Sequence, residues 1–172
     1  MGDKAKLDTV RSEIRERGEA WVLIWPRVGD ERGSHRHTYG QLTPYFKALT
    51  RGRLMGTRCT NPDCPVSGGK GEIWLPPRID CPDCHATMEW AEVKNPEGTI
   101  YTYTFVERGG TGLEIECPYY QIDVRIPGVC TIVKSWLADR DHKLKIGDKV
   151  RARFLTGEEA THTCLDLYWE LV

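Results

Sequence analysis

Residues 59–84 read CTNPDCPVSGGKGEIWLPPRIDCPDC, a segment that holds two closely spaced pairs of cysteines. Cys59 and Cys64 enclose four residues, Cys81 and Cys84 enclose two, and sixteen residues separate the pairs. The proline and aspartate inside each pair favour tight turns. Two such turns can supply the two edges of a tetrahedral four-sulfur metal site. The pattern therefore predicts one structural Zn²⁺ bound by all four cysteines.

A site of this kind is closed. Four thiolates fill the coordination shell and leave no position for substrate or water, so we expect a structural and not a catalytic metal. Ligation of about 10–16 kcal/mol can stand in for a hydrophobic core in a segment so poor in apolar residues. Iron is an alternative metal, because rubredoxin binds iron through cysteines at similar spacing. The other alternative is that the four cysteines lie in loops and bind no metal. His85 follows Cys84 directly, and we expect it beside the site or at the surface.

The composition is that of a soluble globular protein. The chain has 172 residues, 40% of them hydrophobic and 28% charged, and a net charge of −1. No apolar run reaches the roughly 20 residues that span a bilayer, and the first residues lack the apolar core of a secretory signal. Cysteines in metal-like pairs suit a reducing compartment. We expect a cytoplasmic protein without a membrane segment.

Charge is unevenly distributed along the chain. Residues 1–58 hold twelve Lys and Arg against seven Asp and Glu, whereas residues 59–172 hold twelve against eighteen. An excess of basic residues in the N-terminal third most often forms a solvated basic face. The same residues could also attract an anionic ligand such as a nucleotide-bearing thioester.

Helices are predicted in residues 1–52. Leu7, Val10 and Ile14 form an apolar stripe in a helix over residues 3–18, and a second helix begins near Thr43, which can act as its cap, and Pro44, and ends at Gly52. Between them, residues 20–25 form a short strand that is apolar on both faces, and residues 28–38 form a loop. We expect this region to be a helical arm.

Residues 53–90 form the predicted zinc ribbon, and residues 91–172 a predicted five-stranded barrel of the OB type. Apolar side chains alternate with polar ones, and turn signals separate the short segments. The strands are expected at residues 100–105, 120–126, 130–137, 149–155 and 162–171. Tyr101, Tyr103 and Phe105 alternate on the first strand, and we expect them in the barrel core, with a platform for stacking bases as the alternative. The fold class is thus mostly β with N-terminal helices, a rubredoxin-like zinc ribbon and an OB-fold barrel.

The sequence does not show the parts of an enzyme. His162, Cys164 and Asp166 would share one face of the last strand, but residues two apart lie about 6.6–6.8 Å from each other, and the face looks solvated. Cys117 is expected to be an incidental loop thiol. No phosphate-binding loop, dinucleotide fingerprint or His-Glu-x-x-His motif is present.

Binding is the remaining possibility. Nucleic acid is disfavoured, because the ribbon and barrel are acidic and would repel phosphates. A protein partner is favoured, because the arm is rich in aromatic residues on short elements that bury little by themselves. Packing of the arm on the barrel is the alternative. Candidate contacts with a partner or with CoA are Trp21, Trp25, Tyr45, Phe46 and Arg78, although a local salt bridge explains Arg78 equally well.

An ordered set of motifs resembles the rubredoxin-like zinc-ribbon/OB-fold family of thiolase-associated accessory subunits. The matching positions are Pro44, Tyr45, Phe46, Leu49, 52–54, Arg58, Cys59, 76–78, 81–84, Trp90, 98–104, Pro118, Tyr119 and 146–150. The chain departs from the family in the four residues between its first two cysteines, where two are more usual, and in a longer, Trp-rich extension before residue 40.

The resemblance implies a non-catalytic zinc-binding subunit in a hetero-oligomer with a thiolase-like catalytic subunit, which would supply the catalytic cysteine. Such a subunit would stabilise its partner and shape the site of an acyl-CoA thioester, for instance benzoylsuccinyl-CoA in anaerobic toluene degradation. The N-terminal extension would wrap the partner. A stand-alone acyl-CoA-binding protein and a nucleic-acid-binding ribbon/OB protein are the alternatives.

Overall fold

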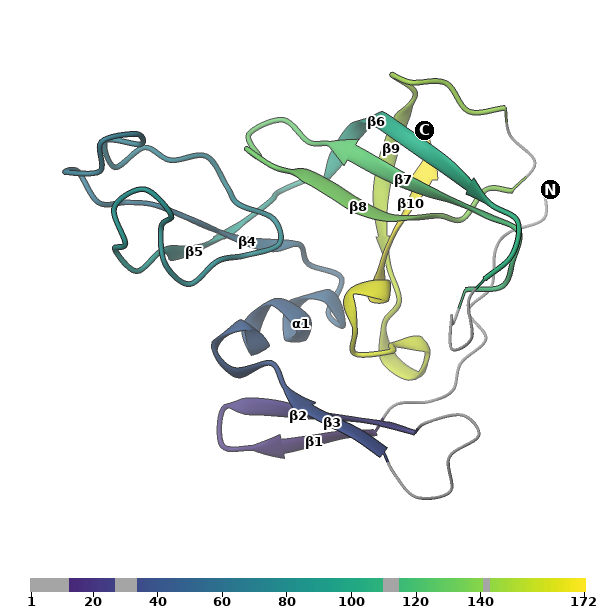
Figure 1. Cartoon of the computed structure of the whole chain (residues 1–172), viewed down its shortest axis with the longest axis horizontal. Helices are drawn as coiled ribbons and strands as arrows, with labels where there is room; N and C mark the ends of the chain where they lie inside the picture. Colours follow the sequence, from purple (N-terminus) through teal and green to yellow (C-terminus); the bar gives the residue numbers. More distant parts are fainter. Residues whose placement is uncertain (1–12, 27–33, 110–114, 141–142) are drawn as a thin grey trace.

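The computed structural model describes residues 13–26, 34–109, 115–140 and 143–172. Three assemblies of strands follow one another along the chain (Figure 1): a three-stranded sheet, a two-stranded ribbon and a closed five-stranded barrel. A short helix lies between the first sheet and the other two parts. None of the described helices is long and apolar enough to cross a membrane.

The barrel confirms the predicted small β-barrel. Its strands are β6 (Glu97–Val106), β7 (Tyr119–Arg125), β8 (Ile132–Leu137), β9 (Lys149–Phe154) and β10 (Leu167–Leu171), in the closed order β10-β8-β7-β6-β9. Buried residues alternate with exposed ones along the first half of β6 and along β9, as in a half-buried strand. Trp169 and Ile122 are among the fully buried side chains of this core.

The prediction that Tyr101, Tyr103 and Phe105 belong to the core is wrong, since 49%, 38% and 44% of their surfaces are exposed. The ladder of β6 with β7 shifts register between Ile100 and Thr102. Strand β9 pairs with β6 only over residues 97–99. Beyond that point β6 pairs only with β7, whereas β7 also pairs with β8. The outer edge of β6 therefore has no neighbouring strand among the described residues to cover the three aromatic side chains.

The ribbon pairs β4 (Met55–Arg58) with β5 (Glu89–Glu92) in antiparallel register. A bridge from Thr57 to Trp74 adds a third segment, and a bridge from Ile73 to Val129 joins the ribbon to the barrel. Gly56 permits this packing, because a Cβ atom there would lie 2.5 Å from the carbonyl oxygen of Trp74. The ribbon is therefore fixed to the barrel through one short segment.

The N-terminal arm is a sheet and not a pair of helices. Strands β1 (Glu13–Arg17), β2 (Ala20–Pro26) and β3 (Ser34–Thr38) are antiparallel in the order β1-β2-β3. The predicted helix over residues 3–18 is wrong where the structure describes it, because residues 13–17 pair with β2. Residues 3–12 lie outside the described residues. The predicted loop over residues 28–38 is wrong at residues 34–38, and the predicted strand over residues 20–25 is confirmed.

One α-helix, α1 (Thr43–Leu49), occurs in the described part of the chain, after the 3₁₀ turn η1 (Gly40–Leu42). The fold class was thus wrong in predicting several N-terminal helices. Thr43 does not cap α1, since the capping residue is Leu42. Its hydroxyl instead donates to the Gly40 carbonyl at 2.7 Å and accepts from the Trp21 amide at 3.3 Å. This threonine ties β2 to the start of the helix.

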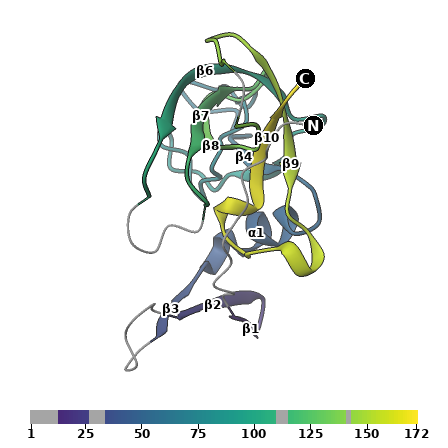
Figure 2. The same ribbon diagram turned by 90° about the vertical axis from the view of Figure 1, so that its right-hand side faces the viewer.

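The segment before β10 differs from the prediction too. The strand expected from residue 162 begins at Leu167, because the 3₁₀ turns η2 (Gly157–Glu159) and η3 (Cys164–Asp166) precede it. Strand β2 contacts η1, α1 contacts η3, and the first sheet projects away from the barrel (Figure 2). The Tyr39 hydroxyl, just after β3, donates to the His162 carbonyl at 2.7 Å. The arm therefore packs on the chain's own C-terminal loop.

Candidate metal centre

The four predicted cysteines meet at the end of the ribbon. Their sulfur atoms all lie within 4.8 Å of one another and form the group of residues that could hold a metal ion. The sulfurs of Cys59 and Cys84 are 3.6 Å apart, and those of Cys64 and Cys81 are 4.0 Å apart. A tetrahedron with metal–sulfur bonds of about 2.3 Å has edges of roughly 3.8 Å. The spacing thus fits a four-thiolate metal site and is far from the ~2.05 Å of a disulfide.

Two turns build the site. In the first, the Cys64 amide donates to the Asn61 carbonyl at 3.1 Å, and the Asp63 amide donates to the Asn61 side chain at the same distance. In the second, the His85 amide donates to the Cys81 carbonyl at 2.9 Å, and His85 takes a left-handed φ of 59°. These turns form locally, which is why the spacing alone predicts them.

The surroundings act differently on two of the four thiols. At Cys81, the backbone hydrogen bond from Asp83 is outweighed by burial and by hydrogen bonding to Cys59 and Cys84, which raise the pKa to about 11, whereas at Cys64 the surroundings favour the thiolate. Hydrogen bonds from Ser67 lower the pKa of Cys64 to about 6, and the Ser67 amide lies 3.5 Å from the Cys64 sulfur. Cys59, Cys64 and Cys81 are buried, whereas Cys84 is half-buried. Met88 and the partly buried Trp74 pack against them. Water thus reaches the site chiefly at Cys84.

Arg78 lies near the ribbon, as expected, and its guanidinium stacks over the Trp74 ring at 4.9 Å. Its backbone is held on both sides by Thr57, whose hydroxyl donates to the Arg78 carbonyl at 2.8 Å and accepts from the Arg78 amide at 2.9 Å. Arg78 therefore has a local packing role. Its contact with a partner or with CoA stays a prediction.

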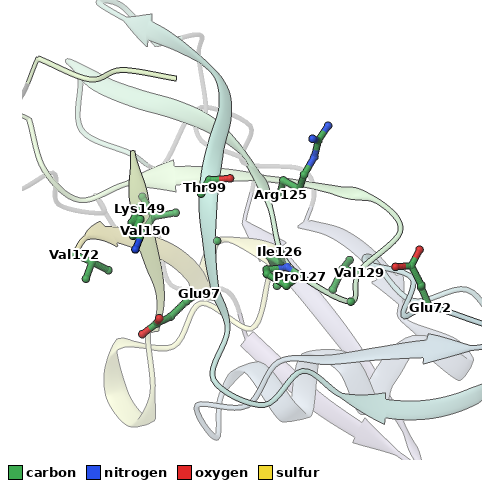
Figure 3. Close-up of a pocket in the computed structure, with 12 residues that line it drawn as sticks. Glu72, Glu97, Thr99, Arg125, Ile126, Pro127, Val129, Lys149, Val150 and Val172 are labelled. Atoms are coloured by element: carbon green, nitrogen blue, oxygen red, sulfur yellow. The ribbon is translucent and has the colours of Figure 1, made fainter. Parts of the chain in front are cut away.

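A cavity of about 460 Å³ opens between the barrel and the ribbon (Figure 3). Its apolar lining comes from Ile126, Pro127, Val129 and Val150, and its charged lining from Glu72, Glu97, Arg125 and Lys149. Glu97 is paired with Arg151 at 2.7 Å, and the Arg125 guanidinium lies 4.9 Å from the centre of the Tyr101 ring. This mixture suits an amphipathic ligand group, and the size falls in the range of small-molecule sites.

The aromatic residues among the predicted partner contacts belong to β2 and α1 and not to the ribbon that holds the metal site. Trp21 and Tyr45 are buried within the chain, and Phe46 stacks on Tyr39 with ring centroids 3.6 Å apart. The side chain of Trp25 lies outside the described part of the structure. The arm and α1 thus bury much of their own aromatic surface. Contact of these residues with a partner stays a prediction.

The face of His162, Cys164 and Asp166 is not the solvated strand face that the sequence predicts. Asp166 is fully buried and accepts three hydrogen bonds: from the Thr161 amide at 2.6 Å, the Thr161 hydroxyl at 2.7 Å and the His162 amide at 2.9 Å. Burial raises the pKa of its carboxyl group. The group organises a loop, a role that sequence reasoning missed. Thr163 and Asp166 have the spacing of a capping box, and the Thr163 hydroxyl does accept from the Leu165 amide at 3.1 Å. The donors to Asp166 are residues 161 and 162 instead, which that spacing does not predict.

Comparison with known proteins now adds to this geometry. Residues 90–155 match the family model described as ChsH2, C-terminal OB-fold domain. A DUF35 domain-containing scaffold protein of Methanocaldococcus jannaschii is 28% identical over 102 residues, which make up 59% of this chain and 67% of that protein. The model thus covers β6 to β9 of the barrel but not β10, and the likeness to the relative spans a longer stretch of 102 residues.

Two solved structures share the fold. A DUF35-family protein of unknown function from Sulfolobus solfataricus has a TM-score of 0.53 and 19% identity, over 77% of this chain and 87% of its own. A chain of the Ltp2-ChsH2(DUF35) aldolase has a TM-score of 0.57 and 20% identity, over 84% of this chain and 98% of its own. The resemblance predicted from the sequence is confirmed by the match of residues 90–155 to the ChsH2 OB-fold domain and by the likeness to a DUF35 scaffold protein, and the barrel has the OB fold.

Proposed function

We propose that this protein is a non-catalytic accessory subunit of a thiolase-type complex that acts on an acyl-CoA thioester. The observation that carries the proposal is the correspondence with the aldolase chain, which spans 98% of that chain and so includes more than the barrel. The relative named a scaffold protein supports the same role. The subunit would stabilise its catalytic partner and shape the partner's CoA-substrate site.

The metal centre supports a structural role. We propose Zn²⁺ as the resident ion, because four thiolates with tetrahedral spacing form a closed site that suits it. Cys59, Cys64, Cys81 and Cys84 would hold the ion between the two turns of the ribbon. Bound there, it would supply folding free energy to a segment with almost no core of its own. Iron remains the alternative that metal analysis decides.

Catalysis is assigned to the partner. Among the described residues, His162, Cys164 and Asp166 most resembled a catalytic set. Asp166 has a structural role there, because its carboxyl group accepts hydrogen bonds from Thr161 and His162. The substrate we propose is a CoA thioester of the benzoylsuccinyl-CoA kind, and the cytoplasm is the proposed compartment.

Two other functions are alternatives to this proposal. The cavity of about 460 Å³ would suit a stand-alone acyl-CoA-binding protein. The exposed Tyr101, Tyr103 and Phe105 would suit base stacking in a nucleic-acid-binding protein. The second function is opposed by charge, because residues 59–172 carry twelve basic against eighteen acidic side chains.

The proposal is tested by purifying the untagged protein from its source and assaying acyl-CoA thiolysis in the co-eluting fraction. A larger polypeptide should co-elute, and activity should require both chains. Turnover of a CoA thioester by this chain alone would contradict the proposal. Salt-sensitive binding to single-stranded DNA or RNA, without a protein partner, would favour the nucleic-acid function instead.

A further inference from the structure

The first sheet has one face turned inward and one turned away from the molecule. Trp21 and Leu23, on alternate positions of β2, are buried on the inner side. Ala20, Val22 and the buried Ile24 take the other positions, and the register places Arg17 opposite Ala20, Arg15 opposite Val22 and Glu13 opposite Ile24. Because opposite residues of an antiparallel pair share a face, these arginines lie on the outer side. Arg36 of β3, opposite Ile24, joins them there.

By register, three arginines and Glu13 belong to the outer face, so the face has a net positive charge above an apolar floor. Its three arginines are exposed, whereas Ala20 and Val22 between them are partly buried. A hollow of about 310 Å³ lies on this face and is lined by Arg17, Ala20, Val22, Arg36, His37 and Thr38. The guanidinium of Arg17 has no ion pair with any residue that the structure describes. The face thus presents a cationic group with unused hydrogen-bond donors beside a small apolar recess.

We infer that this outer face is a docking surface for an acidic, partly apolar segment of a protein partner. The inference deepens and rests on the proposed function, since it makes the catalytic subunit the holder of that segment. A guanidinium binds a carboxylate through two parallel hydrogen bonds, which gives orientation as well as attraction. The recess between Arg17 and Arg36 accommodates the apolar side chain next to such a carboxylate.

Charge complementarity identifies the partner as protein. Residues 1–58 carry a net excess of basic side chains, while the ribbon and barrel beyond them are acidic. A phosphate backbone that ran along the molecule would be attracted at the sheet and repelled elsewhere. A short acidic peptide segment meets only the basic face. The sheet also projects away from the barrel (Figure 2).

The inference is tested on the full chain by NMR titration of the ¹⁵N-labelled protein with a short capped peptide of alternating glutamate and leucine. A peptide with glutamine in place of glutamate is the matched probe. The acidic peptide should shift the amide signals of β1, β2 and β3, and the shifts should weaken as ionic strength rises. The double variant R17E/R36E should bind it roughly tenfold more weakly. R51E/R108E, which reverses two exposed arginines outside the face, should bind it like the wild type.

Three results would overturn the inference: equal binding of both peptides, equal binding by both double variants, or tighter binding of a single-stranded oligonucleotide than of the acidic peptide. The same variants also separate this inference from the proposed function. If the wild type forms no complex with a catalytic subunit, the proposed function fails. The peptide titration then still tests whether the outer face binds an acidic segment. If R17E/R36E forms the complex as tightly as the wild type does, the docking surface is wrong and the proposed function stands.

Discussion

The indole ring of Trp21 meets the imidazole ring of His162 edge to face, with centroids 5.4 Å apart and planes at 76°. One residue belongs to the second strand of the chain and the other to the loop before the last strand. Lys47 of α1 lies over the same indole at 5.4 Å, and the Trp21 ring nitrogen donates to Glu16 at 3.3 Å. The contact makes the N-terminal arm part of one fold with the barrel.

Trp21→Ala should destabilise the protein by about 3–5 kcal/mol, because it removes a large buried side chain and leaves a cavity between the sheet and the loop of His162. Urea unfolding followed by tryptophan fluorescence measures the loss. Val66→Ala, at an exposed site in the ribbon, is the control and should change stability by less than about 0.5 kcal/mol. If the two variants are equally stable, the arm does not pack as described.

Asp166→Ala should cost about 2–3 kcal/mol, because it leaves the amides of Thr161 and His162 without their buried acceptor. His162 holds a left-handed φ of 61°, and the lost hydrogen bonds would release it. The contact of Trp21 with this loop should loosen as a consequence. Hydrogen exchange of the residue 161–166 amides measures the effect, and unchanged protection would argue against the role of Asp166.

The pH dependence of Asp166 has a definite sign. Burial raises the pKa of its carboxyl in the folded state, so folding favours the protonated form. The stability that this group contributes is therefore fully present below its unfolded pKa of about 3.9 and is lost as pH rises through the folded value. The stability difference between the wild type and Asp166→Asn should shrink as pH rises from about 4. A difference that is constant or grows with pH would contradict this.

Removal of the metal should unfold the ribbon first. Cys81→Ser removes one buried sulfur of the four, and a strong chelator removes the ion from the wild type. In both cases we expect the segment between β4 and β5 to become sensitive to protease while the barrel strands stay protected. Cys117→Ser, outside the site, is the control. A ribbon that resists protease without metal would show that ligation does not hold it together.

Gly98→Ala should destabilise the barrel by about 1–3 kcal/mol, because the added Cβ would lie 2.5 Å from the Arg125 carbonyl oxygen on the neighbouring strand. Backbone cannot move aside as a flexible side chain can. Thr99→Ala, at the next and exposed position of β6, is the matched control and should change the thermal midpoint little. Equal midpoints for the two variants would mean that β6 and β7 are not so close there.

The parts of the fold that local patterns determine were predictable from the sequence. The turns at Asn61 and His85 follow from residue type and spacing, and the barrel strands follow from alternation of apolar and polar side chains. Ile14 shows where this fails: an apolar residue at that spacing suits either a helix or a strand. The choice is made by pairing with Leu23, which lies on another strand.

The exposure of Tyr103 and the burial of Asp166 depend on tertiary structure in the same way. Tyr103 alternates like a core residue, and only the limited reach of β9 along β6 leaves it uncovered. Asp166 is charged and would ordinarily be at the surface, but the loop of residues 161–166 folds around it. The sequence contains Thr161 and His162, which donate to that carboxylate, but it does not predict that the loop closes over Asp166.

Native mass spectrometry of the untagged protein from its source is the most direct test of the central claim, because one spectrum reports both the bound metal and the partner. We predict a hetero-oligomer in which each copy of this chain carries one Zn²⁺ and is joined to a larger thiolase-like subunit. A metal-free chain with its fold intact and no second polypeptide would contradict the account.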